Sequence, residues 1–302
     1  MFSVIIFFIM DILFFSYIYH KYFDMPFEIN IKKYIKAARI RNFHETYQYL
    51  NNVGYFRDVI TDTKNQDSKS ILIFGCSFGY GHLLKKEQSF SYKLSKLAKR
   101  NVYNRSIPSL GVQYFPYIMK NFDIEKTVTN PEYIIFVFID NHIYRLYRYF
   151  YEDVEAFKDI RYKSVNNKLT QINDRNNIFQ YFSIIRYLQN VFGKIKYESK
   201  SFDENFDFMK QHFLYAKEIA TEKFPKAKLV ILKYQETQNS EIYLSKRWKE
   251  LQKEGFIVID SYSLTGKDLC DREFRLKDNI HPNEKAWDIL TPKIIEKLYE
   301  KT

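Results

Sequence analysis

Short apolar segments alternate with longer amphipathic segments along most of this chain. Continuous apolar runs of strand length predict buried strands at Ser70–Phe74, Asn101–Ser106, Tyr133–Ile139, Lys228–Lys233 and Phe256–Ile259. Apolar residues at helical spacing predict helices at Glu87–Lys99, Val112–Asn121, Asn205–Lys223, Glu241–Lys253 and Pro282–Tyr299. Strands joined by helix-length crossovers pair in parallel, with helices covering both faces of the sheet. The pattern therefore predicts an α/β fold with a mainly parallel, five-stranded sheet.

The N-terminus, MFSVIIFFIMDILFFSYIY, is apolar over about the length needed to cross a bilayer. Asp11 near its middle costs about 2.5–3.5 kcal/mol on insertion scales, which the many Ile, Leu and Phe residues offset. We predict a single-pass transmembrane anchor at residues 1–23 and a helical stalk or linker at residues 24–67. The alternative is an N-terminal helix buried in the protein.

The remaining chain, residues 68–302, forms one domain in this interpretation. The polar, turn-forming stretch TDTKNQDSKS marks its beginning. A segment rich in Tyr, Arg and Asn, at about residues 143–201, interrupts the alternation and is predicted to be a helical insertion above the strand ends. Such an insertion covers a substrate, or is a peripheral addition without a role in binding.

Charge and cysteine content narrow the classes of function. The formal net charge is +11, but the Lys and Arg residues are spread thinly and form no nucleic-acid-binding motif, so no nucleic acid is expected as a partner. The chain has two cysteines, Cys76 and Cys270, and neither has the partner spacing of a metal site. No metal or organic cofactor is expected, and a single disulfide between the two cysteines stays open.

Three glycines surround one serine in the segment FGCSFGYG, where Gly75, Gly79 and Gly81 flank Ser77. Glycines after a buried strand permit turns that a side chain would forbid. A serine in such a strand-to-helix turn has an exposed hydroxyl and a backbone N–H near a helix start, as a nucleophile with an adjacent oxyanion site requires. The segment lacks the spacing of a P-loop or a dinucleotide-binding loop.

Near the C-terminus, LKDNIHPNEKAW places Asp278 three residues before His281. On a loop, this spacing lets the carboxylate accept a hydrogen bond from imidazole Nδ1 and leaves Nε2 free to take a proton from a serine. Taken singly, the two residues are equally typical of an ordinary acid before a helix and a surface histidine.

Two further strand ends carry candidate oxyanion donors. The third strand ends at Asn141, whose amide could donate to a developing oxyanion, with Asp140 and His142 as neighbours that could serve as acid or donor instead. The second strand leads into a turn with Ser109 and Gly111, whose backbone N–H groups can point inward. Ordinary loop residues at strand ends are the alternative at both places.

In their order along the chain, these segments resemble the SGNH hydrolases, the superfamily of GDSL-like esterases and lipases. Gly75-Cys76-Ser77 matches the family's Gly-Asp-Ser with Cys in place of Asp, and Asp278, His281 and Pro282 match its Asp-x-x-His-Pro. The resemblance implies a three-layer α/β/α, flavodoxin-like sandwich. It also implies that Ser77 is the nucleophile, His281 the base and Asp278 the residue that orients it.

The family's remaining blocks match less closely. Counted from Asn104, its oxyanion glycine falls on Ser109, and the nearest glycine is Gly111. The oxyanion donors implied are therefore the backbone N–H groups of Ser77 and of Ser109 or Gly111, with the Asn141 side chain.

The resemblance implies a serine esterase or acyltransferase that needs no cofactor. With the predicted anchor, it suggests O-acetyl groups on a cell-envelope or exported polysaccharide, with lipid esters as a second substrate class. A membrane-anchored, glycan-binding or assembly protein that has lost activity is the alternative from another class. Lys and Arg residues after the anchor favour a cytoplasmic domain, whereas the function favours the periplasmic or extracytoplasmic side.

Overall fold

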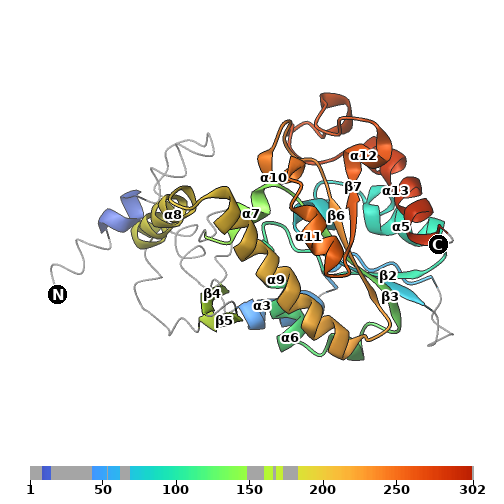
Figure 1. Cartoon of the computed structure of the whole chain (residues 1–302), viewed down its shortest axis with the longest axis horizontal. Coiled ribbons are helices and arrows are strands. Elements are labelled where there is room, and N and C mark those ends of the chain that lie inside the picture. The colour runs from blue at the N-terminus through green and yellow to red at the C-terminus, as the bar shows by residue number, and fades with distance from the viewer. Residues whose placement is uncertain are drawn as a thin grey trace.

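The computed structural model describes residues 9–14, 43–52, 54–61, 69–147, 160–165, 168–172 and 183–300. Its centre is a five-stranded sheet in the order β2-β1-β3-β6-β7, in which every pairing is parallel (Figure 1). The strands are β1 (Ser70–Gly75), β2 (Asn101–Asn104), β3 (Pro131–Phe138), β6 (Lys228–Lys233) and β7 (Ile257–Asp260). The predicted α/β fold with a parallel five-stranded sheet is confirmed.

Helices cover both faces of the sheet. One face packs against α6 (Tyr114–Asn121), α9 (Phe202–Lys223) and α11 (Trp248–Lys253), and the other against α5 (Phe90–Ala98) and α13 (Glu284–Tyr299). Alternate strand residues face opposite sides, so the chain needs apolar residues at successive positions to fill both layers.

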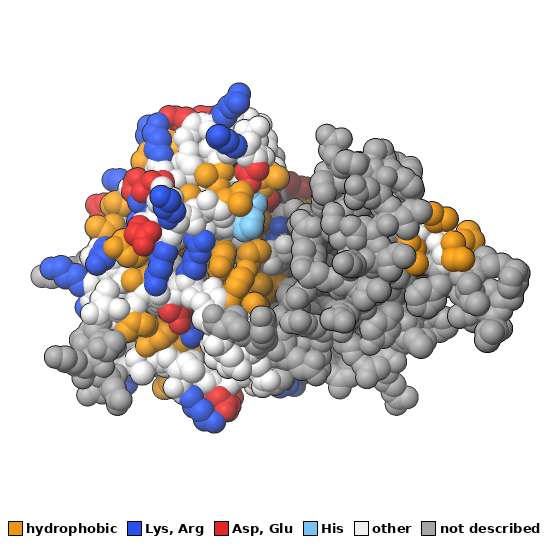
Figure 2. All heavy atoms as spheres, turned by 180° about the vertical axis from the view of Figure 1, so that it is seen from behind, with side chains coloured by type: hydrophobic (Ala, Val, Ile, Leu, Met, Phe, Trp, Pro, Cys, Tyr) orange, Lys and Arg blue, Asp and Glu red, His pale blue; other side chains and the backbone are white. Residues whose placement is uncertain are grey.

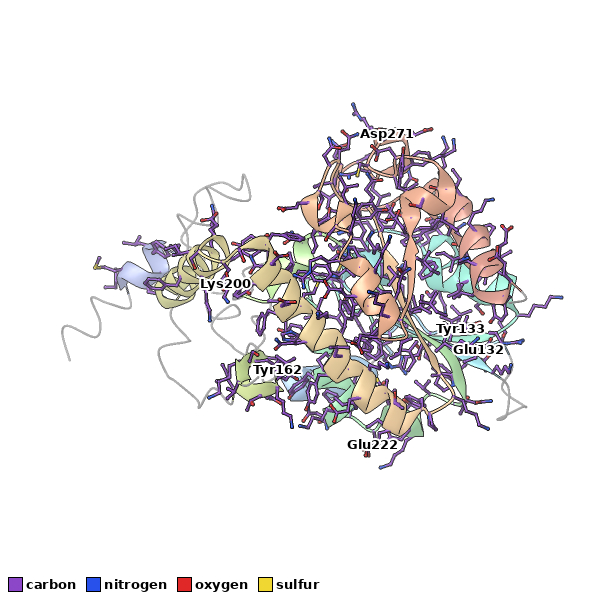
Figure 3. The ribbon with its side chains drawn as sticks, viewed as in Figure 1. Glu132, Tyr133, Tyr162, Lys200, Glu222 and Asp271 are labelled. Carbon is purple, nitrogen blue, oxygen red and sulfur yellow. The ribbon has the colours of Figure 1, made fainter. Side chains whose placement is uncertain are left out.

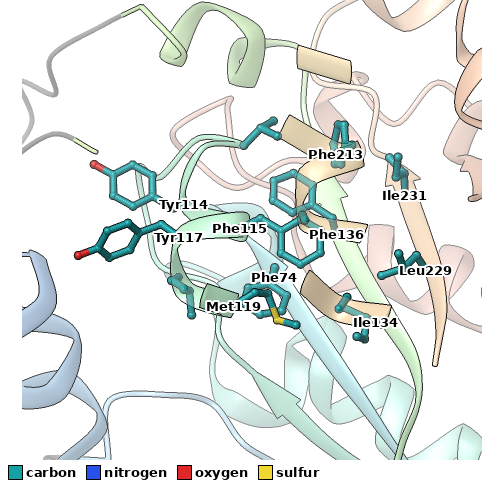
Figure 4. Packing of buried hydrophobic residues seen from close by; sticks show 14 of the residues in the cluster. Phe74, Tyr114, Phe115, Tyr117, Met119, Ile134, Phe136, Phe213, Leu229 and Ile231 are labelled. Carbon is teal, nitrogen blue, oxygen red and sulfur yellow. The ribbon is translucent and has the colours of Figure 1, made fainter. Parts of the chain in front are cut away.

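The apolar core is consequently divided into two clusters. On the α6–α9 side, the Phe115 ring contacts those of Phe74 and Phe136, and the Phe136 ring contacts that of Phe213 (Figure 4). On the opposite side, Ile73 packs in the cluster that contains Trp287 of α13. Both clusters pack against β1, which lies between β2 and β3, and this packing fixes the position of the residues that follow it.

The other described elements are shorter or peripheral. They are α3 (Phe43–Asn52), α4 (Ser77–Tyr80), η1 (Lys86–Gln88), η2 (Ile124–Lys126), α7 (Asn141–Arg145), β4 (Arg161–Val165), β5 (Lys168–Ile172), α8 (Ser183–Glu198), α10 (Glu241–Leu244), α12 (Ser261–Thr265) and η4 (Arg272–Phe274). In Figure 3, Glu132 and Tyr133 mark the amino end of β3, and Asp271 lies at the opposite side, in the segment between α12 and η4.

Most predicted bounds shift by one to three residues, and two of the differences have a clear local cause. The helix predicted at Glu241–Lys253 is divided into α10 and α11, because Ser245 leaves the helical conformation, with ψ 131°, and its side chain accepts the N–H of Arg247 at 3.1 Å. The helix predicted from Pro282 begins at Glu284, because the Asn283 side chain caps its first turn.

The predicted helical insertion also contains a β-hairpin. Strands β4 and β5 pair antiparallel, and the pairing of Val165 with Lys168 leaves a two-residue connection. Only α7 and α8 among the described parts of the insertion are helical. Alternating polar residues and an Asn-Asn pair at residues 166–167 are the local signal for such a hairpin.

Within the described ranges, no helix combines the length and the apolar character needed to cross a membrane. Residues 9–14 of the predicted anchor are helical, and the rest of residues 1–23 lies outside the described residues. Described parts of the predicted linker pack on the domain: the Tyr47 ring lies 4.0 Å from that of Phe122, and Val59 pairs with Val102 of β2.

Candidate active site

Ser77 follows β1, an inner strand flanked by β2 and β3, and begins a short helix. Strand β1 ends at Gly75 and α4 starts at Ser77, so the backbone N–H of Ser77 lies at a helix start. Gly81 ends α4 with φ +73°, a left-handed conformation that favours glycine, and its N–H donates to the Ser77 carbonyl at 3.0 Å. The Ser77 side chain is held in this turn with 7% of the residue exposed.

Asp278 organises the loop that carries His281. One carboxylate oxygen accepts the backbone N–H groups of Ile280 and His281 at 3.0 and 3.1 Å, and the other lies 2.6 Å from His281 Nδ1. Asn279 between them adopts φ +56°, which asparagine tolerates better than most residues. The loop thereby fixes the orientation of the imidazole ring.

The two segments meet, although 204 residues separate them. His281 Nε2 lies 2.8 Å from Ser77 Oγ. When Nδ1 carries the proton and donates to Asp278, Nε2 is the acceptor for the Ser77 hydroxyl. Burial of the Asp278 carboxyl opposes ionisation, but hydrogen bonds from His281 and Ile280 outweigh it and hold the pKa of Asp278 below its ordinary value.

The candidate oxyanion residues lie on both sides of Ser77, since β2 and β3 are the strands that flank β1. Ser109, after β2, has φ +75°, the conformation for which glycine is favoured. Gly111 is needed for a different reason: a Cβ there would lie 2.4 Å from Gln113 Oε1 and 2.9 Å from Arg145 Cβ. Ser109 therefore has a backbone conformation typical of glycine, whereas Gly111 is required because a side chain there would clash with Gln113 and Arg145.

Hydrogen bonds join this turn to the turn after β3. The backbone N–H of Asn141, the first residue of α7, donates to Glu236 Oε2 at 3.0 Å. Arg145 at the other end of α7 donates to the Leu110 carbonyl at 3.1 Å, and its own carbonyl accepts from Gln113 Nε2 at 3.0 Å. The two sides of the site are thus braced against each other.

His142 and Asp140, the neighbours of Asn141, make contacts that stabilise the fold. His142 is fully buried between Phe136 and Phe138, and burial holds its pKa well below the ordinary value. Its ring is therefore neutral and remote from solvent. Burial raises the pKa of Asp140, whose carboxylate accepts the Thr237 hydroxyl at 2.6 Å.

Both cysteines are free. Cys76 is completely buried beside Ser77, with 3.9 Å between Sγ and Ser77 Oγ, and burial raises its pKa. Cys270 donates to the Gln235 carbonyl at 3.6 Å, and burial raises its pKa to about 12. The two thiols are therefore not joined in a disulfide, which answers the question that the sequence left open.

The structure adds three residues that the sequence analysis did not identify. The His82 ring lies 5.1 Å from the His281 ring, and Glu236 supports Asn141 as described above. Arg275 donates to the carbonyls of Glu236 and, at 2.6 Å, Asn279, which ties the histidine loop to the end of β6. His82 was detectable by its proximity to the glycine-rich segment, whereas nothing local identifies Arg275.

No cluster of three or more metal-ligating side chains of a suitable kind occurs in the part of the chain that the structure describes. The arrangement that is present, a carboxylate, an imidazole and a serine hydroxyl in line, is suited to nucleophilic attack on a carbonyl group.

Comparison with known proteins identifies similar structures but no similar sequences. No family model matches the chain, and no curated protein matches it. A member of the lipolytic protein G-D-S-L family from Veillonella parvula is 11% identical over 78% of this chain and 100% of its own, with a TM-score of 0.46. The lipase Lip_vut3 from a goat rumen metagenome is 13% identical over 77% of this chain and 98% of its own, with a TM-score of 0.45. A family two carbohydrate esterase from Clostridium thermocellum, in complex with cellohexaose, is 9% identical over 80% of this chain and 66% of its own, with a TM-score of 0.46.

Proposed function

We propose that this protein is a serine ester hydrolase or acyltransferase of the SGNH type. The observation that carries the proposal is the line of hydrogen bonds from Asp278 through His281 to Ser77, with distances of 2.6 and 2.8 Å. Each residue has the surroundings its role requires: the carboxylate is ionised, the imidazole is oriented, and the serine begins a helix at a strand end.

In the proposed reaction, Ser77 Oγ attacks the ester carbonyl carbon while His281 Nε2 takes the hydroxyl proton. The carbonyl oxygen becomes an oxyanion, which the N–H groups of Ser77 and Ser109 and the side-chain amide of Asn141 stabilise. Collapse breaks the ester bond, and His281 returns the proton to the departing alkoxide. The acyl group then remains on Ser77 as an ester.

The acyl-enzyme is resolved by a second attack. His281 takes a proton from water or from an acceptor hydroxyl, whose oxygen attacks the acyl carbon, and Ser77 leaves with the proton restored. Water gives hydrolysis, and a sugar hydroxyl gives transfer. We propose O-acetyl groups on a cell-envelope or exported polysaccharide as the substrate, because the Gly75-Cys76-Ser77-Phe78 opening resembles that of polysaccharide-associated members of the superfamily.

Lipid esters are a second candidate substrate class, favoured by apolar side chains next to the site. Leu83 follows His82 and is 65% exposed, and Ile280 precedes His281 and is 50% exposed. From behind the molecule, a histidine side chain is visible beside hydrophobic side chains (Figure 2). A higher kcat/KM for 4-nitrophenyl octanoate than for 4-nitrophenyl acetate would favour lipid esters over acetyl groups.

The decisive experiment is labelling of the full chain with a fluorophosphonate probe of activated serines. Labelling is expected in the wild type and in Cys76→Ser, and is expected to be lost in Ser77→Ala and His281→Ala. Circular dichroism of each variant separates loss of the nucleophile from loss of the fold. An unlabelled, folded wild type would contradict the proposal and favour a glycan-binding or assembly protein.

We also propose that residues 1–23 anchor the protein in a membrane, on the basis of their apolar sequence. Full-length protein is expected to stay with membranes after an alkaline carbonate wash, whereas a chain without residues 1–23 is released. Protease accessibility of the domain in intact cells then tests the extracytoplasmic side. Release of the full-length chain by carbonate would overturn the anchor.

A further inference from the structure

A pocket of about 350 Å³ opens at the carboxyl edge of the sheet, next to the proposed oxyanion residue Asn141. Its walls come from α7, from α10 and from the junction of α8 and α9, which lie side by side in Figure 1. Asn141 and Glu236 line it at the strand ends, so the pocket adjoins the elements that position the reaction. Its volume is at the small end of the range for ligand sites, which suits one sugar ring better than a long chain.

The lining combines aromatic rings with hydrogen-bond acceptors. Tyr144 and Tyr197 pack edge to face, with 5.4 Å between their ring centroids. The carboxylates of Asp140, Glu236 and Glu241 also line the pocket, and no Lys or Arg does so as far as the structure describes the lining. Asp140 Oδ1 is buried without a hydrogen-bond partner among the described residues.

This chemistry selects the ligand class. Carboxylates accept hydrogen bonds from hydroxyl groups and repel phosphate or carboxylate groups, which disfavours anionic lipids and acidic sugars. An aromatic face contacts the apolar C–H surface of a sugar ring, while fatty acyl chains gain nothing from carboxylates. We propose that this pocket binds a neutral glycosyl unit of the ester substrate and presents it to Ser77, an inference that rests on the proposed esterase function.

The test uses the full chain and three esters: mono-O-acetylated methyl glucoside and mono-O-acetylated N-acetylglucosamine, which contain a sugar, and 4-nitrophenyl acetate, which does not. The measured quantity is kcat/KM for the sugar ester divided by kcat/KM for 4-nitrophenyl acetate. Tyr197→Ala is expected to lower this ratio about 10-fold, because KM for the sugar ester rises. Glu241→Ala is expected to lower it by about 3-fold or more. Tyr197→Phe, which keeps the ring, should keep the ratio at the wild-type value.

Phe192→Ala is the matched control, because Phe192 is an aromatic residue of the same helix, is 64% exposed and does not line the pocket. It should leave both activities at wild-type values. An unchanged ratio in Tyr197→Ala, or an equal fall in Phe192→Ala, would overturn the pocket as the sugar site.

A binding measurement separates this inference from the proposed function. Saturation-transfer NMR with methyl β-glucoside and N-acetylglucosamine, on the full chain with Ser77→Ala, should show transfer to at least one sugar that disappears when Tyr197→Ala is added. Absence of transfer to both sugars, or transfer that persists without Tyr197, would refute the pocket. Failure of wild-type protein to cleave any ester, with sugar transfer present, would refute only the esterase.

Discussion

Two hydrogen-bonded side-chain clusters lie at the carboxyl edge of the sheet, and their chemistry differs. The first joins Asp278, His281 and Ser77, as described above. The second joins Lys233 and Asp260, the paired last residues of β6 and β7, through 2.7 Å between Nζ and Oδ2. Both contain an acid, a base and a hydroxyl group within hydrogen-bonding reach.

The second cluster is saturated, in the sense that both carboxylate oxygens of Asp260 already accept hydrogen bonds. Lys233 is 5% exposed, and its ammonium lies over the rings of Tyr243 and Trp248, at 4.4 and 5.3 Å from their centroids. The other oxygen of Asp260 accepts the Tyr243 hydroxyl and the Ser263 N–H, both at 2.8 Å. A partly buried ion pair whose carboxylate oxygens all have hydrogen-bond partners specifies structure and offers a substrate no free acceptor.

The first cluster differs in the nature of its base and in its surroundings. In the first cluster an imidazole nitrogen lies beside a serine hydroxyl and can accept its proton, whereas the lysine ammonium of the second cluster has donors only and lies beside a carboxylate. Among the described residues, six besides glycine have positive φ; Leu83, Ser109 and Asn279 lie in the segments around the first cluster, and Asn239 lies before α10. Strain of this kind persists where the surrounding structure enforces it, often at functional sites.

The largest expected effect separates Ser77 from Ser261, whose hydroxyl lies 3.2 Å from the Tyr243 hydroxyl of the second cluster. Ser77→Ala should lower kcat for 4-nitrophenyl acetate by about 10⁴-fold or more, since it removes the nucleophile. Ser261→Ala should leave kcat at the wild-type value but destabilise the fold by about 1–3 kcal/mol, because the buried Ser261 hydroxyl accepts the Gln235 N–H at 3.1 Å. Kinetics and urea unfolding of both variants check this. Similar losses of activity in the two variants would break the comparison.

Removing the cation from the saturated cluster should cost about 3–5 kcal/mol of unfolding free energy, because Lys233→Met leaves Asp260 without its charged partner. Adding Asp260→Asn should recover part of this loss. Urea unfolding of the single and double variants gives the coupling. A Lys233→Met protein as stable as the wild type would show that the pair contributes nothing.

Low pH should reduce the contribution of Asp260 in the second cluster to the free energy of unfolding. Burial of Asp260 raises its pKa, but Lys233, Ser263 and Tyr243 outweigh burial and lower it overall. A lowered folded-state pKa adds stability above the unfolded value of about 3.9, and this stability is lost as the pH falls through the folded-state pKa. The stability difference between wild type and Asp260→Asn should therefore shrink below about pH 4. A constant difference from pH 7 to pH 3 would contradict it.

The smallest expected effect concerns strain beside the first cluster. Ser109→Gly should stabilise the fold by about 1 kcal/mol, because glycine adopts φ +75° without the steric cost that serine incurs. Ser109→Ala retains the Cβ and should show no such gain. Thermal unfolding of both variants measures the difference. Equal stability of the glycine and alanine variants would show that this turn stores no strain.

The parts of the site that the sequence predicts correctly depend on residues that are close together in the chain. Apolar runs specify buried strands, so the position of Ser77 after β1 follows from residues adjacent to it in sequence. The contact of Asp278 with His281 likewise depends on a spacing of three residues within one loop. The hairpin of β4 and β5 and the break between α10 and α11 were missed, because polar turn residues decide them within otherwise helical patterns.

By itself, the sequence determined the parallel α/β fold, the turn around Ser77 and the pairing of Asp278 with His281, because each depends on residue order and short spacings. Only the tertiary structure decided that His281 reaches Ser77, that Glu236 holds Asn141, and which residues line the pocket between α7, α8, α9 and α10. These contacts join strand ends whose order in the sheet is set by crossover packing between distant segments, and no local pattern encodes that order.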